Sequence, residues 1–168
     1  MKIGILGGSF DPAHKGHLAI SKEAKRRFKL EKIIWAVTKK NPLKAESKTP
    51  ISKKIKDCKK IIGMNSFIKV KFYENIIKSN KTIDLINYLK KDKKIEIFFL
   101  MGADNLNKFH KWFRSKLISQ KCNIIVFDRH GYKKNSLKSK TFKRLNNKTL
   151  TFVEFKKVNI SSSQLRKI

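Results

Sequence analysis

Two short segments at opposite ends of the chain carry residue types that can hold phosphate. Residues 7–17 read Gly-Gly-Ser-Phe-Asp-Pro-Ala-His-Lys-Gly-His and directly follow an apolar run. Residues 160–166 read Ile-Ser-Ser-Ser-Gln-Leu-Arg. Glycines open the main chain to a phosphate, while imidazole, hydroxyl and guanidinium groups donate hydrogen bonds to it. Two such segments in one chain indicate a protein that handles a nucleoside triphosphate.

The first segment stands where a strand is expected to give way to a helix. The glycines at 7–8 allow backbone dihedrals that are closed to other residues, and they let a phosphate approach the main chain. Ser9 and Phe10 would then offer backbone N–H groups in a concave loop. His14 and His17 are three residues apart, so both can face one side of the helix start. A packed core or a metal site are the alternatives for these imidazoles, although no third metal ligand stands nearby.

An alternation of apolar β-rich runs and helical patterns supplies the elements that position these residues. The expected strands cover residues 2–6, 32–37, 67–72, 95–101, 123–127 and 150–155. The expected helices cover residues 16–28, 50–62, 82–90 and 105–119. Near-continuous apolar runs suggest strands that are covered on both faces. The pattern predicts an α/β fold with a doubly wound parallel sheet, which binds ligands beyond the carboxyl ends of its strands.

Two local features refine this outline. Pro50 suits the first turn of a helix, and Thr49 before it is a candidate N-cap. Residues 131–148 are polar and lysine-rich with little periodicity, so we expect this segment to be the most mobile. No linker divides the chain, which predicts a single domain over residues 1–168.

The composition limits the class of protein. No run approaches 18 consecutive apolar residues and no signal peptide opens the chain, which predicts a cytoplasmic protein without a membrane span. Cys58 and Cys122 stand far apart and outside any metal-binding pattern, so we expect reduced thiols.

The formal net charge of +30 invites a nucleic-acid interpretation. Only six of the 42 basic residues are arginine, and the lysines are spread along the whole chain. This distribution favours nonspecific RNA binding at low salt over specific recognition.

Residues 8–17 resemble the signature of the nucleotidylyltransferases that carry an HxGH motif. Further segments resemble, in order, bacterial nicotinate-nucleotide adenylyltransferase: Asn-Pro-Leu-Lys at 41–44, Thr-Ile-Asp at 82–84, Met-Gly-Ala-Asp-Asn-Leu at 101–106, Trp112, Arg-His-Gly-Tyr at 129–132, and residues 160–166. The resemblance runs from Met1 to Ile168 and implies a Rossmann-like nucleotidylyltransferase fold.

The resemblance implies transfer of AMP from ATP to nicotinate mononucleotide, giving deamido-NAD and pyrophosphate. It makes His14, His17 and Arg166 the catalytic residues. It assigns ATP binding to Gly8, Ser9, Phe10, His14, His17, Gly102, Asp104, Ser161, Ser162, Ser163 and Arg166. It assigns mononucleotide binding to Lys44, Thr82, Trp112 and Arg129. Mg²⁺ would arrive on the ATP phosphates, since no carboxylate cluster offers a dedicated cage. A helix N-cap is the alternative for Asp104, and a packed core is the alternative for Trp112.

Several positions depart from the family pattern. Lys81 stands where the family usually has tyrosine, Leu85 where threonine is common, and His130 where proline is usual. The family continues for about two helices beyond the last motif, so the chain is expected to be shortened at its C-terminus. The oligomeric state stays open between a monomer and a homodimer.

Two rival functions remain. Phosphopantetheine adenylyltransferase shares the first motif, but it usually carries threonine at the position of His14 and lysine at that of Arg166. A basic RNA-associated protein on the same fold would account for the net charge, but not for the intact histidines.

Overall fold

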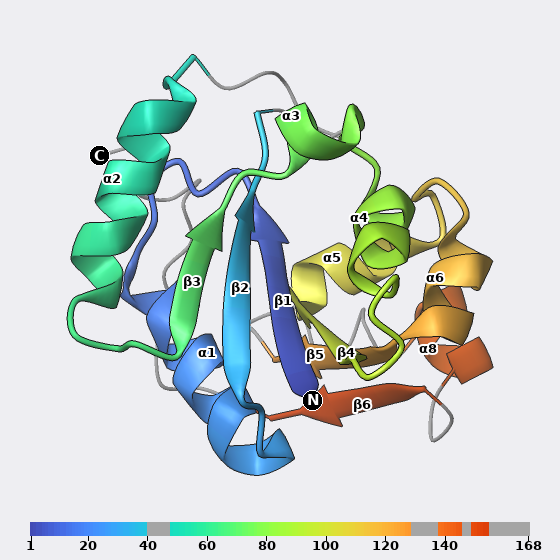
Figure 1. Ribbon diagram of the computed structural model, residues 1–168. Helices are drawn as coiled ribbons and strands as arrows, with labels where there is room; N and C mark the ends of the chain where they lie inside the picture. The colour runs from blue at the N-terminus through green and yellow to red at the C-terminus, as the bar shows by residue number, and fades with distance from the viewer. Residues whose placement is uncertain (40–47, 129–137, 146–148, 155–168) are drawn as a thin grey trace.

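The computed structural model describes residues 1–39, 48–128, 138–145 and 149–154 (Figure 1). Within them, six parallel strands form one sheet in the order β3-β2-β1-β4-β5-β6. The strands are β1 (Lys2–Gly8), β2 (Lys32–Val37), β3 (Ile68–Lys71), β4 (Glu96–Gly102), β5 (Asn123–Phe127) and β6 (Leu150–Val153). The α/β prediction of a doubly wound parallel sheet is confirmed.

Helices cover both faces of this sheet. The described helices are α1 (Lys15–Phe28), α2 (Ile51–Ile62), α3 (Glu74–Ile77), α4 (Thr82–Leu89), α5 (Ala103–Phe109), α6 (Ser115–Lys121) and α8 (Lys140–Leu145). Helices α1 and α2 share one core cluster with Trp35, whereas α4, α5, α6 and α8 share the other with Phe99. Figure 1 shows the two groups on opposite sides of the strands. The direction of winding therefore reverses between β1 and β4, which is where such sheets bind ligands.

The predicted strands match the observed ones to within two residues at each end, but two helix predictions were wrong. The helix expected over 105–119 is two helices, because the chain turns at residues 110–114 and Arg114 adopts a left-handed φ of 55°. Thr49 does not cap α2: Pro50 is the N-cap, and the Thr49 hydroxyl donates instead to Asp11 Oδ1 at 2.7 Å. Helix α3 was not predicted, and α8 forms inside the segment expected to be mobile.

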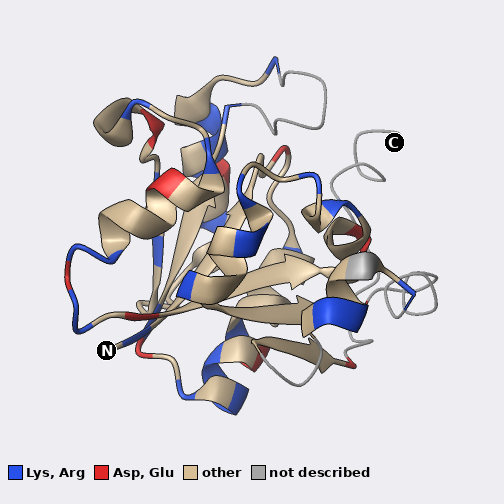
Figure 2. Cartoon of the chain, turned by 90° about the vertical axis from the view of Figure 1, so that its right-hand side faces the viewer, with Lys and Arg blue, Asp and Glu red and all other residues tan. Residues whose placement is uncertain are grey.

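Basic residues are distributed over the surface elements rather than gathered on one of them. Figure 2 shows lysine and arginine on most of the helices and connecting segments of the visible side. In the part of the chain that the structure describes, no helix is long and apolar enough to cross a bilayer.

Candidate functional site

The first functional segment begins inside β1 rather than in a turn. The strand was expected to end at residue 6, but the glycines at 7–8 belong to it and do not use the positive φ that glycine allows; among the described residues, Gly63 is the glycine with positive φ. The left-handed position belongs to Phe10, with φ 49°. Phe10 is 2% exposed and stacks on Trp35, with ring centroids 5.1 Å apart. Burial of its ring holds Phe10 in a conformation that non-glycine residues seldom adopt.

The two histidines form a capping box at the start of α1. His14 is the N-cap, and its Nδ1 accepts the backbone N–H of Gly16 at 3.0 Å. His17 is the third residue of the helix, and its Nδ1 accepts the backbone N–H of His14 at 3.1 Å. The ring centroids are 3.9 Å apart, so the expected placement of both imidazoles on one side is confirmed. A box of this kind is usually made by a hydroxyl and a carboxyl group.

These hydrogen bonds assign the protons of both imidazoles. A ring nitrogen that accepts a hydrogen bond carries no proton, so in the neutral tautomer the proton of each ring is on Nε2. Both rings can therefore donate from Nε2 without being charged. His17 also lies 4.6 Å from the ring of Phe10, measured between centroids, which fixes its orientation.

The carboxyl end of β2 is held by polar contacts that the sequence interpretation missed. Lys54 is 1% exposed, and its Nζ donates to the Thr38 carbonyl at 3.1 Å. The Thr38 hydroxyl donates to Glu74, whose second carboxylate oxygen accepts the backbone N–H of Lys39. These contacts tie α2 and α3 to the strand end. Lys54 could have been found, because it occupies an inward position in the apolar stripe of α2.

The carboxyl end of β4 carries the second group of candidate residues. Gly102 ends this strand and is the N-cap of α5, and Asp104 follows in the first turn of the helix. The alternative of Asp104 as a helix N-cap was therefore wrong. Since β1 and β4 are parallel neighbours in the sheet, Gly102 and the histidine pair both lie at the carboxyl ends of its central strands.

Thr82 and Trp112 lie on the face of the sheet that α4, α5 and α6 cover. Thr82 is the first residue of α4. Trp112 is half-buried and meets Phe99 edge-on, with centroids 5.8 Å apart, and Phe109 at 5.2 Å. Trp112 thus packs partly in the core, as the alternative interpretation expected, and the rest of its side chain is exposed to solvent. Lys44, Arg129, Ser161, Ser162, Ser163 and Arg166 lie outside the described residues.

The two cysteines are buried, on opposite faces of the sheet. Burial raises the pKa of the Cys58 thiol and of the Cys122 thiol to about 12 each. Neither is a nucleophile near neutral pH, because the thiolate is the reactive form. Within residues 1–39, 48–128, 138–145 and 149–154, no three His, Cys, Asp or Glu side chains gather as a metal site.

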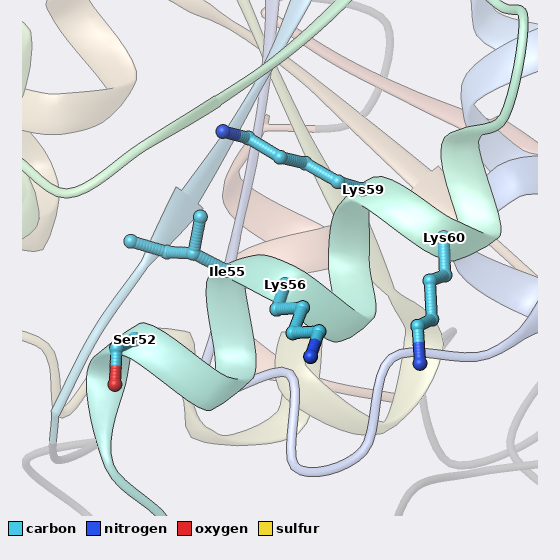
Figure 3. Close-up of a pocket in the computed structure, with 5 residues that line it drawn as sticks. All are labelled: Ser52, Ile55, Lys56, Lys59 and Lys60. Carbon is cyan, nitrogen blue, oxygen red and sulfur yellow. The ribbon is translucent and has the colours of Figure 1, made fainter.

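A hollow of about 520 Å³ lies on the outer surface of α2 (Figure 3). It is lined by Ser52, Ile55, Lys56, Lys59 and Lys60. All five residues belong to α2, so the described lining of this hollow comes from one helix and offers mainly the positive charge of its lysines.

Comparison with known proteins decides the family. A model of the cytidylyltransferase-like family matches residues 5–168. A curated protein of Pelagibacter ubique (strain HTCC1062), named probable nicotinate-nucleotide adenylyltransferase, is 67% identical over 167 residues, which are 99% of this chain and 93% of the relative. The chain belongs to the nicotinate-nucleotide adenylyltransferase family. A relative of the same name from Methylorubrum extorquens (strain PA1) is 37% identical over 134 residues, 79% of this chain and 72% of the relative.

Solved structures show the same fold for this adenylyltransferase family member. A Plasmodium falciparum nicotinic acid mononucleotide adenylyltransferase complexed with NaAD aligns with a TM-score of 0.78 and 21% identity, over 99% of this chain and 82% of that one. The same enzyme complexed with APC aligns with a TM-score of 0.77. The resemblance of the sequence motifs to this family, and the Rossmann-like nucleotidylyltransferase fold, are both confirmed.

Proposed function

We propose that this chain transfers AMP from ATP to nicotinate mononucleotide, forming deamido-NAD and pyrophosphate in NAD biosynthesis. Family membership supports the reaction, and the observation that carries it is the histidine pair at the start of α1. The Nδ1 atoms of His14 and His17 accept backbone N–H groups, so the neutral form of each ring carries its proton on Nε2, and the two rings lie next to each other. Paired donors at a helix start suit a polyphosphate.

The reaction needs positioning and charge stabilisation more than proton transfer. An oxygen of the 5′-phosphate of nicotinate mononucleotide attacks the α-phosphorus of ATP, and the bond from that phosphorus to the bridging oxygen of the β-phosphate breaks. Pyrophosphate leaves with the electron pair. The attacking phosphate is already an anion, so no general base is required. His14 and His17 would donate to the α- and β-phosphates, where negative charge grows in the transition state.

The remaining assignments extend this proposal along the substrates. Gly8, Ser9 and Phe10 would line the phosphates, and Gly102 and Asp104 would hold the adenosine. Ser161, Ser162, Ser163 and Arg166 would bind the β- and γ-phosphates. Lys44, Thr82, Trp112 and Arg129 would bind the mononucleotide, with the pyridine ring stacked on Trp112. Mg²⁺ would come with ATP, whose phosphates are oxygen ligands of the kind that this ion prefers.

Four expectations about the whole protein stay predictions. These are a single domain over residues 1–168, a cytoplasmic location, a monomeric or homodimeric state, and nonspecific RNA binding at low salt. The three lysines that line the hollow on α2 would contribute to RNA binding through phosphate contacts, which added salt weakens.

The test is release of pyrophosphate by the purified protein with ATP and one of four additions: nicotinate mononucleotide, nicotinamide mononucleotide, phosphopantetheine or no acceptor. We expect release that depends on nicotinate mononucleotide. A double variant, His14→Ala with His17→Ala, purified in the same way, controls for contaminating enzymes. Release that requires phosphopantetheine would support the rival enzyme of the superfamily, and release with none of the acceptors would contradict the proposal.

A further inference from the structure

Two cations meet one exposed aromatic ring in the turn between α5 and α6. Phe113 is 51% exposed. The Nζ of Lys81 lies 5.0 Å from the centroid of the Phe113 ring, and the guanidinium carbon of Arg114 lies 5.2 Å from it. Both distances are within the range in which an aromatic ring attracts a cation. We call Lys81, Phe113 and Arg114 the cationic cluster.

The described residues do not neutralise this cluster. Their ion pairs join Arg26 and Arg27 to Glu23, and Lys53 to Asp57, so neither Lys81 nor Arg114 is paired with a carboxylate among them. Asp84, one turn after Lys81, accepts the hydroxyl of Ser79 at 2.5 Å instead. Two like charges held at one ring repel each other, and an anion bound beside them relieves that repulsion.

The cationic cluster adjoins the residues that the proposed function gives to the mononucleotide. Lys81 is the N-cap of α4 and directly precedes Thr82. Phe113 directly follows Trp112, whose ring is fixed by Phe99 and Phe109. The Nζ of Lys81 lies over the Phe113 ring, so the two pairs of neighbours in sequence are also neighbours in space. A pyridine ring stacked on Trp112 would bring its ring substituent toward the cluster.

We propose that the cationic cluster selects the acid form of the mononucleotide over the amide form, with Lys81 as the main determinant. This inference rests on the proposed function, since it needs the pyridine ring at Trp112. Nicotinate carries a carboxylate where nicotinamide carries a neutral amide of nearly the same shape. A fixed positive charge therefore discriminates where a steric pocket cannot. Phe113 restrains both cations by cation–π contacts, so less side-chain freedom is lost when the carboxylate binds.

The test measures dissociation constants by isothermal titration calorimetry for nicotinate and nicotinamide mononucleotides. Lys81→Met removes the charge and keeps the length of the side chain. We expect its dissociation constant for the acid to rise about tenfold, as for loss of one partly screened charge pair. The constant for the amide should change less than about twofold, because the neutral group has no ion pair to lose. Lys81→Arg keeps the charge and should keep the preference.

Lys91→Met is the matched control, because the Nζ of Lys91 lies 5.4 Å from the Tyr88 ring at the other end of α4. This variant removes a cation–π contact that lies away from the cationic cluster. The dissociation constants for the acid and for the amide should both stay unchanged. Equal weakening of both ligands by Lys81→Met, or an unchanged constant for the acid, would overturn the proposal.

Pyrophosphate release separates this proposal from the proposed function. If the wild type turns over nicotinate mononucleotide and Lys81→Met keeps the preference for the acid, the role proposed for the cationic cluster is contradicted and the proposed reaction is supported. If binding is selective for the acid and depends on Lys81, but no pyrophosphate is released, the role of the cationic cluster is supported and the proposed reaction is contradicted. Failure of the wild type to bind either mononucleotide would overturn both.

Discussion

The histidine pair and the cationic cluster are built by different means, although both would meet negative charge on a substrate. His14 is 5% exposed, and both imidazoles are held by backbone hydrogen bonds, while the ring of Phe10 also packs at a tilt against that of His17. The cationic cluster is exposed, and cation–π contacts hold its charged groups. Backbone hydrogen bonds fix a donor to within a fraction of an ångström, as a transition state requires. Exposed side chains suit discrimination between two ligands, which needs only a difference in affinity.

This comparison predicts the largest effect at His17. We expect His17→Ala to lower kcat about 100- to 1,000-fold, as for loss of one fixed donor to a charged transition state. The variant also loses the acceptor for the His14 N–H, which is worth about 1 kcal/mol of stability in a helix cap. Steady-state kinetics and a thermal unfolding curve measure the two effects separately.

Two further variants keep the His17 prediction falsifiable. His17→Asn retains an acceptor and an N–H donor, so it should recover the unfolding temperature and part of kcat. His110→Ala, at an exposed histidine that ends α5, should leave both unchanged. A kcat within about threefold of wild type in folded His17→Ala would remove His17 from the phosphates.

A smaller effect is expected at Trp112, which lies between the buried and exposed parts of the site. Trp112→Phe keeps the contact with Phe99 but reduces the stacking surface, so KM for nicotinate mononucleotide should rise roughly fivefold with little change in kcat. The chain has two tryptophans, and Trp35 is 0% exposed beneath Phe10. Fluorescence should therefore be quenched by the mononucleotide in the wild type and hardly at all in Trp112→Phe. Equal quenching in both would return Trp112 to a purely structural role.

The sheet and the histidine pair could be predicted because their signals are local. Apolar runs mark the buried parallel strands, and a spacing of three brings His14 and His17 together on any helix. The glycines at 7–8 were expected to follow the first strand, but they belong to it. Glycine allows a left-handed turn but does not require one, and here the left-handed residue is Phe10, which burial against Trp35 stabilises.

Contacts between distant segments could not be predicted from periodicity. The hydrogen bonds that join Lys54, Thr38 and Glu74 bring together three elements that are far apart in the chain. The cationic cluster likewise depends on the packing of α4 against α6, and on a helix break at Arg114 that no glycine or proline announces. Lys81 stood out in the sequence only as a departure from the family pattern.

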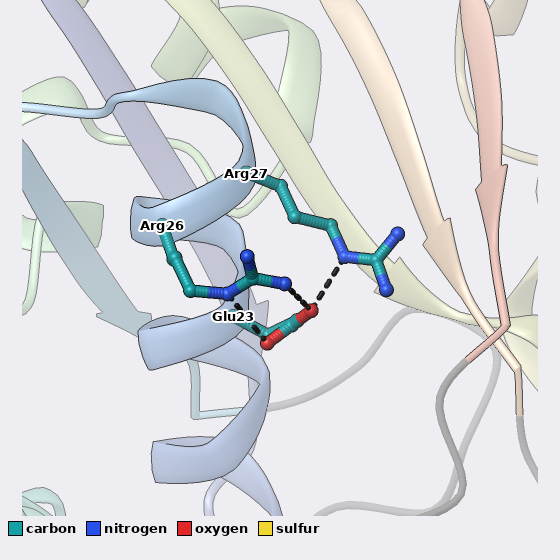
Figure 4. A network of polar contacts seen from close by, with 3 residues as sticks. All are labelled: Glu23, Arg26 and Arg27. Atoms are coloured by element: carbon teal, nitrogen blue, oxygen red, sulfur yellow. Dashed lines mark hydrogen bonds and ion pairs between the residues drawn. The ribbon is translucent and has the colours of Figure 1, made fainter.

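The two ends of α1 extend the comparison to a region where ion pairs within one helix contribute to stability. At its N-terminal end the helix carries the histidine pair, whereas toward its C-terminal end Glu23 accepts hydrogen bonds from Arg26 at 2.7 Å and Arg27 at 2.5 Å (Figure 4). The hydrogen bond from Arg26, followed by that from Arg27, lowers the pKa of Glu23 to about 2. The Glu23 side chain is 11% exposed, but those of Arg26 and Arg27 are 69% and 42% exposed, so solvent weakens both pairs.

The smallest effect on activity is therefore expected for Glu23→Gln, with a loss of about 1–2 kcal/mol in the free energy of unfolding. Because the folded pKa is depressed from 4.5 to about 2, the carboxylate stabilises the protein above pH 4.5, and this contribution is lost as the pH falls toward 2. Urea unfolding of wild type and variant should thus differ at pH 7 and converge by about pH 2. A gap that persists at low pH would show that packing, rather than charge, makes Glu23 stabilising. A fall in kcat at pH 7 would show that the two ends of α1 are coupled.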